Sequence, residues 1–389
     1  MGRYLRKIRE SFLKGDLILL LLCASINAFG LLMVATTTNH IGSTRFLLIQ
    51  GGASLIGILL YTLVSTIDAE FFSEHRQWLV IFNCSLLLLL LPFGTDNGTG
   101  NRSWLDFAFL PIDIQPAELC KITYILIMAS VMASYQNKIS SVKAVLHMAF
   151  HLILLAGLNM AMSRDAGVTL IFVFIFIGMT FAGGVSGIWY LAAAGAIVAA
   201  FPVLWSFLDN YQKLRIQILF DPSLDPTGVG ARYHTVRALR SLTGGGMTGQ
   251  GLFQGHRTQN GALFAQRTDY IFAAVGEELG FVGCALVLIA LALVIFRCVW
   301  VGTRSQDYMR RLICFGAASA MIFQVTSNVG MCIGITPVIG LTLPFISYGG
   351  TSVVSLYAMM GLVSGVYARP APTSHERYIR PPHMYRIKR

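Results

Sequence analysis

Residues 267–296 read RTDYIFAAVGEELGFVGCALVLIALALVIF, a long apolar run with a carboxylate, Asp269, near its N-terminal end. A membrane-spanning helix needs about 20 mostly apolar residues, so this run is long enough to cross a bilayer. An ionisable group at membrane depth is costly to keep and by default indicates a functional site. An Asp at a helix start can equally cap free N–H groups. These residues alone leave both interpretations of Asp269 open.

The rest of the chain repeats this apolar pattern. Hydrophobic residues make up 55% of the 389 residues and charged residues only 12%, far beyond what a soluble domain needs for its core. The sequence therefore predicts an all-α polytopic membrane protein. We expect about ten spanning helices, beginning near residues 17, 46, 79, 117, 145, 167, 188, 270, 312 and 347. The glycine-rich break at 183–187 indicates a tight turn or a kink.

The distribution of Lys and Arg predicts the orientation of the chain. Cytoplasmic segments carry the excess of these residues, which are frequent in the N-terminal tail (1–16) and the C-terminal tail (369–389). We therefore expect both tails to be cytoplasmic, on either side of a membrane domain at 17–368. The loop 209–268, between the seventh and eighth helices, is then extracytoplasmic, because loops that long translocate largely regardless of charge.

Composition also narrows the expected partners. The first apolar stretch lacks a small-x-small cleavage site and is predicted to be a retained anchor. All seven Cys fall within or at the ends of apolar segments, so we expect neither disulfides nor a cysteine metal site. The net charge of +11 fits basic tails on an anionic leaflet. Membrane lipids are thus expected partners, and nucleic acid is not.

The outer loop begins with a segment that could lie in the membrane interface. Residues 211–220 mix apolar and basic side chains, including Tyr211, Lys213 and Arg215, as a short amphipathic helix would. Residues 243–251, TGGGMTGQG, resemble a backbone nest for an anion. The Lys-Ser/Thr of a Walker loop is missing, which favours a flexible hinge beside a site.

A second helical stretch in this loop, Tyr233 to Leu242, places Arg237 and Arg240 three residues apart on one side. Guanidinium groups suit bidentate contact with pyrophosphate, so this stripe could bind a phosphate. Contact with ordinary lipid head groups explains the same pattern.

Two pairs of charged residues are predicted inside the spans. Glu277 and Glu278 would lie about 12 Å deeper than Asp269 on a continuous helix, either in a polar cavity or in buried ion pairs. Glu118 and Lys121, three residues apart, share a helix face and are expected to form an internal salt bridge.

Other polar residues fall at or within the predicted spans. Asp165, after Arg164, lies at the outer connection of the fifth and sixth helices and either reaches the same cavity or forms a water-exposed pair. His147 and His151 have metal-like spacing but no Cys or carboxylate partner at that depth. The spacing of Gln324 and Asn328 is typical of hydrogen bonds between helices.

Residues 334–352, GITPVIGLTLPFISYGGTS, interrupt the helical pattern with two prolines and four glycines. Non-helical backbone at membrane depth is tolerated only inside protein or against a water-filled cavity. We therefore expect this loop, which includes Ser347 and Tyr348, to dip into the bundle and to wall a cavity.

Four stretches together resemble the signature of the SEDS family, the shape, elongation, division and sporulation proteins. They are the loop above with Asn328-Val329-Gly330-Met331 before it, Thr268-Asp269-Tyr270-Ile271-Phe272 with Gly276-Glu277-Glu278-Leu279-Gly280, Gln115-Pro116-Ala117-Glu118-Leu119-Cys120-Lys121, and Ser103-Trp104-Leu105. The resemblance covers nearly all predicted spans. The chain departs from it at 262–265, at 243–246, at Arg237-Ala238 and at 163–167, where Asp165 is kept.

The resemblance implies a ten-helix peptidoglycan glycosyltransferase of the bacterial inner membrane. Such an enzyme polymerises lipid II, the undecaprenyl-pyrophosphate-linked disaccharide-peptide, on the outer face of that membrane, with a class B penicillin-binding protein as transpeptidase. Asp269 then corresponds to the essential acid, which deprotonates the acceptor 4-hydroxyl so that it displaces pyrophosphate with inversion. Arg215 matches a basic family position and would neutralise the pyrophosphate. A divalent cation, Mg or Mn, could assist or substitute.

The predicted site therefore has three groups of residues. Asp269 is the general base. The predicted substrate-binding residues are Arg215, Lys213, Tyr211, Tyr233, Arg237 and Asp165, and those expected to support the cavity are Glu118, Lys121, Glu277, Glu278, Ser347 and Tyr348. A polytopic bundle with intramembrane charges is also what a lipid II transporter looks like. A scaffold that recruits the transpeptidase is a third hypothesis.

Overall fold

The computed structural model describes residues 15–95, 101–106, 113–207, 210–225, 230 and 232–369. Almost all of both predicted basic tails, 1–16 and 369–389, lies outside these residues. The backbone of Tyr211 belongs to a helix, but its side chain also lies outside what the structure describes.

The described residues contain eight helical stretches long and apolar enough to cross a membrane, together with two shorter apolar helices. The ten segments begin within about four residues of the predicted starts, and the all-α prediction is confirmed. Their helices are α2 (Leu17–Thr38), α3 (Arg45–Ser65), α5 (Arg76–Leu88) with α6 (Leu90–Phe93), α7 (Pro116–Ser134), α8 (Val142–Ser163), α9 (Ala166–Ala182), α10 (Gly187–Phe207), α14 (Ile271–Arg304), α15 (Tyr308–Ile333) and α16 (Gly350–Ala368).

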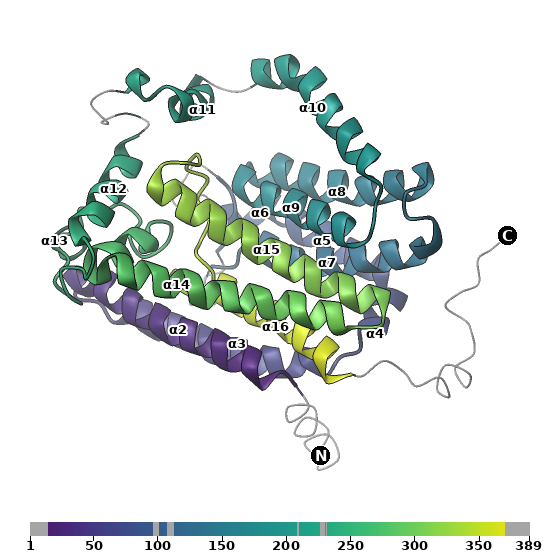
Figure 1. Cartoon of the computed structure of the whole chain (residues 1–389), viewed down its shortest axis with the longest axis horizontal. Coiled ribbons are helices and arrows are strands. Elements are labelled where there is room, and N and C mark those ends of the chain that lie inside the picture. Colours follow the sequence, from purple (N-terminus) through teal and green to yellow (C-terminus); the bar gives the residue numbers. More distant parts are fainter. Residues whose placement is uncertain are drawn as a thin grey trace, which may run out of the picture.

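Shorter elements connect these helices. They are η1 (Asn39–Ile41), α4 (Ala69–Glu74), the strands β1 (Gly94–Thr95) and β2 (Trp104–Leu105), η2 (Gln136–Lys138), α11 (Asn210–Phe220), η3 (Pro222–Leu224), α12 (Tyr233–Gly245) and α13 (His256–Gln259). The two strands pair antiparallel, with Thr95 opposite Trp104. Figure 1 shows α12 and α13 gathered at the end of the bundle where α14 begins. We call this the Asp269 end; the other end, near the described chain termini, is the opposite end.

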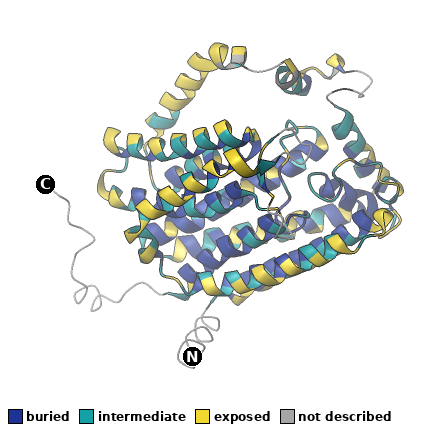
Figure 2. Ribbon diagram, turned by 180° about the vertical axis from the view of Figure 1, so that it is seen from behind, coloured by how far each residue is buried: buried dark blue, intermediate teal, exposed yellow. Residues whose placement is uncertain are grey.

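Helices α7, α15 and α16 form the centre of the bundle, whereas α5 and α8 expose most of their surface (Figure 2). Small residues let α3 and α16 pack backbone to backbone. A Cβ at Gly361 would stand 2.7 Å from the carbonyl oxygen of Tyr61, and one at Gly57 would meet the Tyr357 ring at 2.5 Å. Close contact of this kind stabilises helix pairs in lipid, where apolar side chains gain nothing by leaving the solvent.

A tight turn, not a kink, separates α9 from α10. The Tyr308 hydroxyl donates to the Gly183 carbonyl at 2.8 Å, and the Ser140 hydroxyl accepts from the Ser186 backbone N–H at 2.9 Å. Trp189 also donates to the Ser140 carbonyl. Beyond this anchored base, residues 191–203 are all exposed, and α10 stands apart from the other helices (Figure 1).

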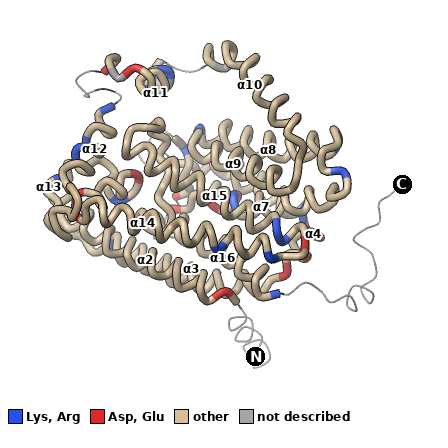
Figure 3. The backbone as a smooth tube through the Cα atoms, viewed as in Figure 1, with Lys and Arg blue, Asp and Glu red and all other residues tan. Residues whose placement is uncertain are grey.

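Ion pairs hold the opposite end together. The Arg297 guanidinium on α14 donates two hydrogen bonds, at 2.8 and 3.0 Å, to the buried carboxylate of Asp16 before α2. It also lies over the rings of Trp300 and Tyr367. Arg310 pairs with Asp68 and Glu70 nearby. Figure 3 shows these charges clustered where α4 meets the ends of α14 and α16.

Candidate functional site

Asp269 lies two residues before α14, and the backbone around it is fixed by other parts of the chain. Three successive carbonyl oxygens accept hydrogen bonds: Arg267 from the Tyr348 N–H at 2.7 Å, Thr268 from the Ser347 hydroxyl at 2.6 Å, and Asp269 from the Asn328 side-chain amide at 2.8 Å. These three bonds, the carbonyl clamp, set the position of the half-buried Asp269 side chain.

Two of the three clamp residues, Ser347 and Tyr348, belong to the loop 334–349, which dips into the bundle as predicted, and the third, Asn328, lies on α15. A Cβ at Gly30 on α2 would stand 2.4 Å from the Phe345 carbonyl oxygen, and one at Gly167 on α9 would be 2.4 Å from that of Ile339. Gln50 on α3 donates to the Ser347 carbonyl and accepts from the Gly349 N–H. The loop is therefore packed among helices, and Ser347 supports the site through its contact with the backbone of Thr268.

The electrostatics of Asp269 differ from those of an exposed aspartate. Burial, with a further contribution from the negative charge of Asp165, raises the pKa of Asp269 to about 6, although a hydrogen bond from Thr268 opposes the shift. A Cβ at Gly340 would be 3.6 Å from Asp269 Oδ2, so the loop passes directly beside the carboxylate. At neutral pH the group is mostly ionised and is a stronger base than an ordinary aspartate.

Asp165 is half-buried, and its carboxylate is turned into the molecule. Its carboxylate caps α9 by accepting from the Val168 N–H at 3.1 Å, and the Ser103 hydroxyl donates to it at 3.3 Å. Burial raises the pKa of Asp165, and the charge of Glu118 adds to that shift. Arg164, in contrast, is exposed. The two residues therefore do not form a water-exposed pair.

Glu118 and Lys121 form the predicted internal salt bridge, with Lys121 Nζ 2.8 Å from Glu118 Oε2, and both side chains are buried. The pair has further partners on other helices. Ser355 on α16 donates to Glu118, and Lys121 donates to Gln324 on α15. Because Glu118 is within electrostatic reach of Asp165, this network continues the line of charged groups that begins at Asp269.

Arg215 on α11 lines a cavity of about 150 Å³ at the Asp269 end. The walls also include Arg232 before α12, Thr235 on α12, and Gly334, Thr336 and Val338 from the dipping loop. Arg215 donates to the Val338 carbonyl at 3.2 Å, and its positive charge acts on the phenol of Tyr270, the residue after Asp269. The prediction that the loop walls a cavity is thus confirmed, and the cavity has a cationic side.

The arginine stripe of α12 makes contacts within the outer loop. Arg237 lies over the Tyr233 ring, 4.3 Å from its centroid, and donates to the Ala262 carbonyl. Arg240 contributes its carbonyl to Arg257. Tyr233 and Arg237 therefore bind each other and the outer loop, whereas helical spacing alone suggested a phosphate-binding face. Lys213 on α11 is half-buried, and no described contact joins it to the cavity.

Glu277 and Glu278 are not among the residues that line the Arg215 cavity, and Arg257 forms an ion pair with Glu277 at 3.9 Å, which is one of the two arrangements expected from the sequence. Both are fully buried. Glu277 accepts hydrogen bonds from the backbone N–H groups of Arg257 and Thr258 and from the Thr258 hydroxyl, at 2.7–3.0 Å. Glu278 accepts from the Phe253 N–H and from Gln259. The glutamates hold the outer loop onto α14.

The glycine-rich segment 243–251 is packed against α14 and is not a free hinge. A Cβ at Gly245 would stand 1.9 Å from the Gly276 carbonyl oxygen, and one at Gly249 would be 2.1 Å from that of Glu278. Gln250 and Gly251 donate their N–H groups to the carbonyls of Glu277 and Glu278. The glycines permit this contact, and α14 accommodates it at Gly280, whose φ is 65°.

Several residues of the site were not singled out by their sequence pattern. Asn328 was expected to form hydrogen bonds between helices, but it donates to the carbonyls of Asp269, which precedes α14, and of Leu341 in the dipping loop. Ser103 and Gln50 were missed as contacts, although Ser103 opens a recognised motif and Gln50 is a polar residue within a span. Burial lowers the pKa of His234 on α12, and the nearby positive charges of Arg215 and Arg237 lower it further.

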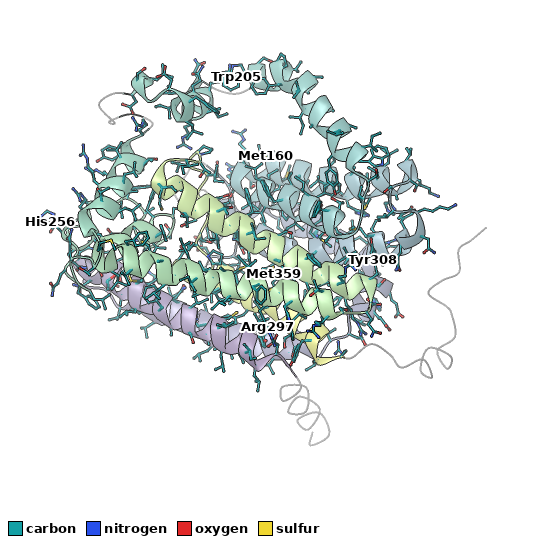
Figure 4. The ribbon with its side chains drawn as sticks, viewed as in Figure 1. Met160, Trp205, His256, Arg297, Tyr308 and Met359 are labelled. Carbon is teal, nitrogen blue, oxygen red and sulfur yellow. The ribbon has the colours of Figure 1, made fainter. Side chains whose placement is uncertain are left out.

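No group of three or more His, Cys, Asp or Glu that could hold a metal ion occurs among the described residues. His147 and His151 lie with ring centroids 5.1 Å apart, and His147 shares a hydrogen bond with the Tyr135 hydroxyl. Figure 4 shows the side chains, with His256 at the Asp269 end and Arg297 and Tyr308 toward the opposite end.

Comparison with known proteins agrees with this arrangement. The family described as cell cycle protein, FtsW/RodA/SpoVE, matches residues 16–370. The peptidoglycan glycosyltransferase MrdB of Escherichia coli K12 is 32% identical over 321 residues, which cover 81% of this chain and 84% of that protein. The probable peptidoglycan glycosyltransferase FtsW of Geobacter metallireducens is 30% identical over 371 residues, 91% and 95% of the two chains.

Solved structures give the same result for the fold. A chain from a peptidoglycan synthase complex, studied for its coordination of polymerization and crosslinking, superposes with a TM-score of 0.77 at 27% identity and covers 94% of this chain and 99% of that one. RodA of Thermus thermophilus has a TM-score of 0.68 at 24% identity, over 92% and 98%. A multi-pass helical bundle, a dipping loop beside a buried acid, and these matches together place the chain in the FtsW/RodA/SpoVE family of cell cycle proteins.

Proposed function

We propose that the protein is a peptidoglycan glycosyltransferase that polymerises lipid II into glycan strands, with Asp269 as general base. The observation that carries this proposal is the carboxylate itself. It is half-buried, has a pKa near 6, is fixed by the carbonyl clamp and stands at the end of the bundle that also holds the Arg215 cavity. Relatives that align over most of their length bear the name peptidoglycan glycosyltransferase.

The chemistry follows from these groups. Asp269 takes the proton of the acceptor 4-hydroxyl, and the oxygen attacks the anomeric carbon of the donor sugar. The bond from that carbon to the pyrophosphate breaks on the opposite face, so the configuration inverts. Arg215 is the side chain placed to neutralise the departing pyrophosphate. A divalent cation, Mg or Mn, would assist in the same way.

Asp165 and the Glu118–Lys121 pair tune this base. The negative charge of Asp165 disfavours ionisation of Asp269 and so strengthens it as a proton acceptor. The Lys121 charge lies next to Glu118, which limits the total negative charge behind the two aspartates. In this proposal these side chains act through Asp269 and do not touch substrate.

The setting of the reaction belongs to the same proposal. The protein lies in the bacterial inner membrane with both termini in the cytoplasm and the Asp269 end outside. It works with a class B penicillin-binding protein that crosslinks the new strands. The similarity to a chain of a synthase complex supports a partner of this kind.

The decisive experiment supplies lipid II to the purified protein and its cognate transpeptidase and measures glycan strands on a gel. Native protein should make polymer, and Asp269→Asn, which keeps the shape of the side chain but cannot accept a proton, should make none. Equal polymer from both would remove Asp269 from catalysis. No polymer from either, together with scrambling of lipid II in vesicles, would favour the transporter.

A further inference from the structure

Two buried amide side chains on α15 each have one polar atom without a partner. Gln324 Oε1 accepts from Lys121 Nζ at 3.3 Å, but Gln324 Nε2 has no hydrogen-bond partner in the described part of the chain. Asn328 Nδ2 donates to the carbonyls of Asp269 and Leu341, and Asn328 Oδ1 is likewise unpartnered among the described residues. Both side chains are fully buried. Buried polar atoms almost always have a partner, so these two need an explanation.

The existing contacts settle which way each amide is turned. The Lys121 ammonium can only donate, so Gln324 turns its oxygen toward Lys121 and its NH₂ group away. The two carbonyls can only accept, so Asn328 turns its NH₂ group toward them and its oxygen away. Exchanging nitrogen and oxygen in either amide would break these bonds. The unpartnered atoms are therefore one donor and one acceptor.

The helix places these two atoms one turn apart. Residues four apart on an α-helix are neighbours on one face, with Cβ atoms about 5–6 Å from each other. The described residues offer neither Gln324 Nε2 nor Asn328 Oδ1 a partner, so the two atoms do not contact each other directly. A single water molecule is the smallest group that accepts from the first and donates to the second. The Lys121 ammonium disfavours a cation here, and the Asn328 oxygen disfavours an anion.

We propose that one buried water joins Gln324 to Asn328 and completes a hydrogen-bonded chain from Lys121 on α7 to the backbone of Asp269. The inference rests on the proposed function, in which Asp269 is the general base. Asn328 holds the Asp269 carbonyl, and the water holds Asn328 through its remaining oxygen. Hydrogen bonds in such a chain strengthen one another. Gln324 is thus a positioning residue, which touches no substrate and acts through Asn328.

A density map tests the water directly. The native protein, enlarged by a bound antibody fragment, is imaged in lipid nanodiscs by cryo-electron microscopy at a resolution that shows ordered waters. We expect a peak about 2.7–3.2 Å from both Gln324 Nε2 and Asn328 Oδ1. Ordered amides with no peak between them, or amides in direct contact, would overturn the proposal. The map does not depend on turnover, so a protein that contains this water but makes no polymer would refute only the glycosyltransferase.

Gln324→Met tests the positioning role. Methionine has nearly the length of glutamine but neither a strong donor nor a strong acceptor, and Lys121 keeps its contact with Glu118. The kcat of lipid II polymerisation per folded protein should fall about two- to tenfold, the range expected for one buried hydrogen bond, while KM changes little. No charge is removed, so the pH below which activity falls, set by the Asp269 pKa of about 6, should not move. An unchanged kcat or a shifted pH limit would contradict the role.

A double-mutant cycle separates the chain from a general loss of packing. In the Asn328→Ala background the chain is already broken, so Gln324→Met should cause almost no further fall in kcat. Thr326→Ala, at an exposed site on the same helix, is the matched control, and Gln324→Met should keep its full effect in that background. An equal effect of Gln324→Met in the native, Asn328→Ala and Thr326→Ala backgrounds would show that Gln324 and Asn328 act independently and would overturn the proposal.

Discussion

Asp269 should give the reaction an acidic limit. Its pKa is raised to about 6, mainly by burial, and the base acts only when ionised. As pH falls through about 6, protonation should remove activity tenfold per further pH unit, while above pH 7 this group should cause no change. The measurement is kcat/KM for lipid II polymerisation between pH 5 and about 8. A flat profile across pH 6 would contradict Asp269 as the base.

Asp165→Asn should move that limit to lower pH. The substitution removes a negative charge that disfavours ionised Asp269, so the pKa of Asp269 should fall. Burial is the larger cause of the shift, and therefore the limit should not reach the value of an exposed aspartate. Asn is as good a helix N-cap as Asp, so α9 should remain intact. An unmoved acidic limit would show that the two carboxyl groups are not coupled.

Asn328→Ala should lower kcat more than it raises KM. The buried amide donates to the carbonyls of Asp269 and Leu341, and losing it leaves Leu341 without this donor and Asp269 with only the Cys332 thiol at 3.9 Å. The expected cost in unfolding free energy is about 1–3 kcal/mol, and a base displaced by about 1 Å can lose up to 100-fold in rate.

The control for that variant is Thr326→Ala on the same helix, an exposed residue whose hydroxyl bonds only to α15 carbonyls. It should retain both rate and stability. Equal kcat in the Asn328 and Thr326 variants would mean that the clamp does not position Asp269.

At the scale of single residues, the sequence predicted which charged groups are enclosed in the molecule better than it predicted their contacts. An ionisable group at membrane depth is energetically costly, so it indicates a functional site or a paired charge. This argument singled out Asp269, Asp165 and the Glu118–Lys121 pair. Arg237 was assigned to substrate because helical spacing shows which side chains share a face but not what covers that face. The outer loop covers it through the Ala262 carbonyl.

Among the elements, the prediction for the dipping loop was right and the prediction for the glycine-rich segment was not. The dipping loop was predicted because prolines and glycines at membrane depth must be buried in protein. The segment 243–251 was predicted to be a hinge, which is wrong. Glycine permits both motion and close backbone contact, and only the structure shows the 1.9 Å approach a Cβ at Gly245 would make to Gly276.

Glu277→Gln should loosen the outer loop. The Glu277 carboxylate accepts three hydrogen bonds from Arg257 and Thr258. The Gln amide that replaces it has only one acceptor oxygen, and its NH₂ group would face donors. The expected loss of unfolding free energy is about 1.5–3 kcal/mol. Limited proteolysis within 246–261 and the melting temperature in detergent would measure it. Glu74→Gln, at an exposed site on α4, is the matched control and should melt like the native protein.

For the whole molecule, Arg297→Ala should separate stability from catalysis. It leaves the Asp16 carboxylate buried without its cation, and breaking such a pair costs about 3–5 kcal/mol. The melting temperature should fall, while polymerisation at a permissive temperature should continue because Asp269 is at the other end. Arg297→Lys should recover part of the loss. A variant that melts normally would show that the pair is not needed for stability.

Orientation in the membrane can be tested with two engineered thiols. Thr248→Cys, within the glycine-rich segment, should react with an impermeant maleimide in intact spheroplasts, and Lys138→Cys in η2 should react only after permeabilisation. Both sites are exposed, and the native cysteines of the described chain are half-buried or buried. The reverse pattern would place Asp269 in the cytoplasm and contradict the proposed reaction.

Hydropathy predicted the spans of the whole molecule but not their arrangement. Helix α10 has the length and apolar composition of its neighbours, yet it stands apart from them beyond Tyr190. Its apolar residues are spread around the whole helix, so periodicity offers no signal about where it docks.

The carbonyl clamp also has a consequence for the timing of biosynthesis. A ribosome delivers Arg267, Thr268 and Asp269 well before Asn328, Ser347 and Tyr348, which hold their carbonyls. A nascent chain therefore inserts its acid into the bilayer before anything can orient it. The protein should become active only after its last helices have inserted and packed. Incomplete chains should therefore have no activity.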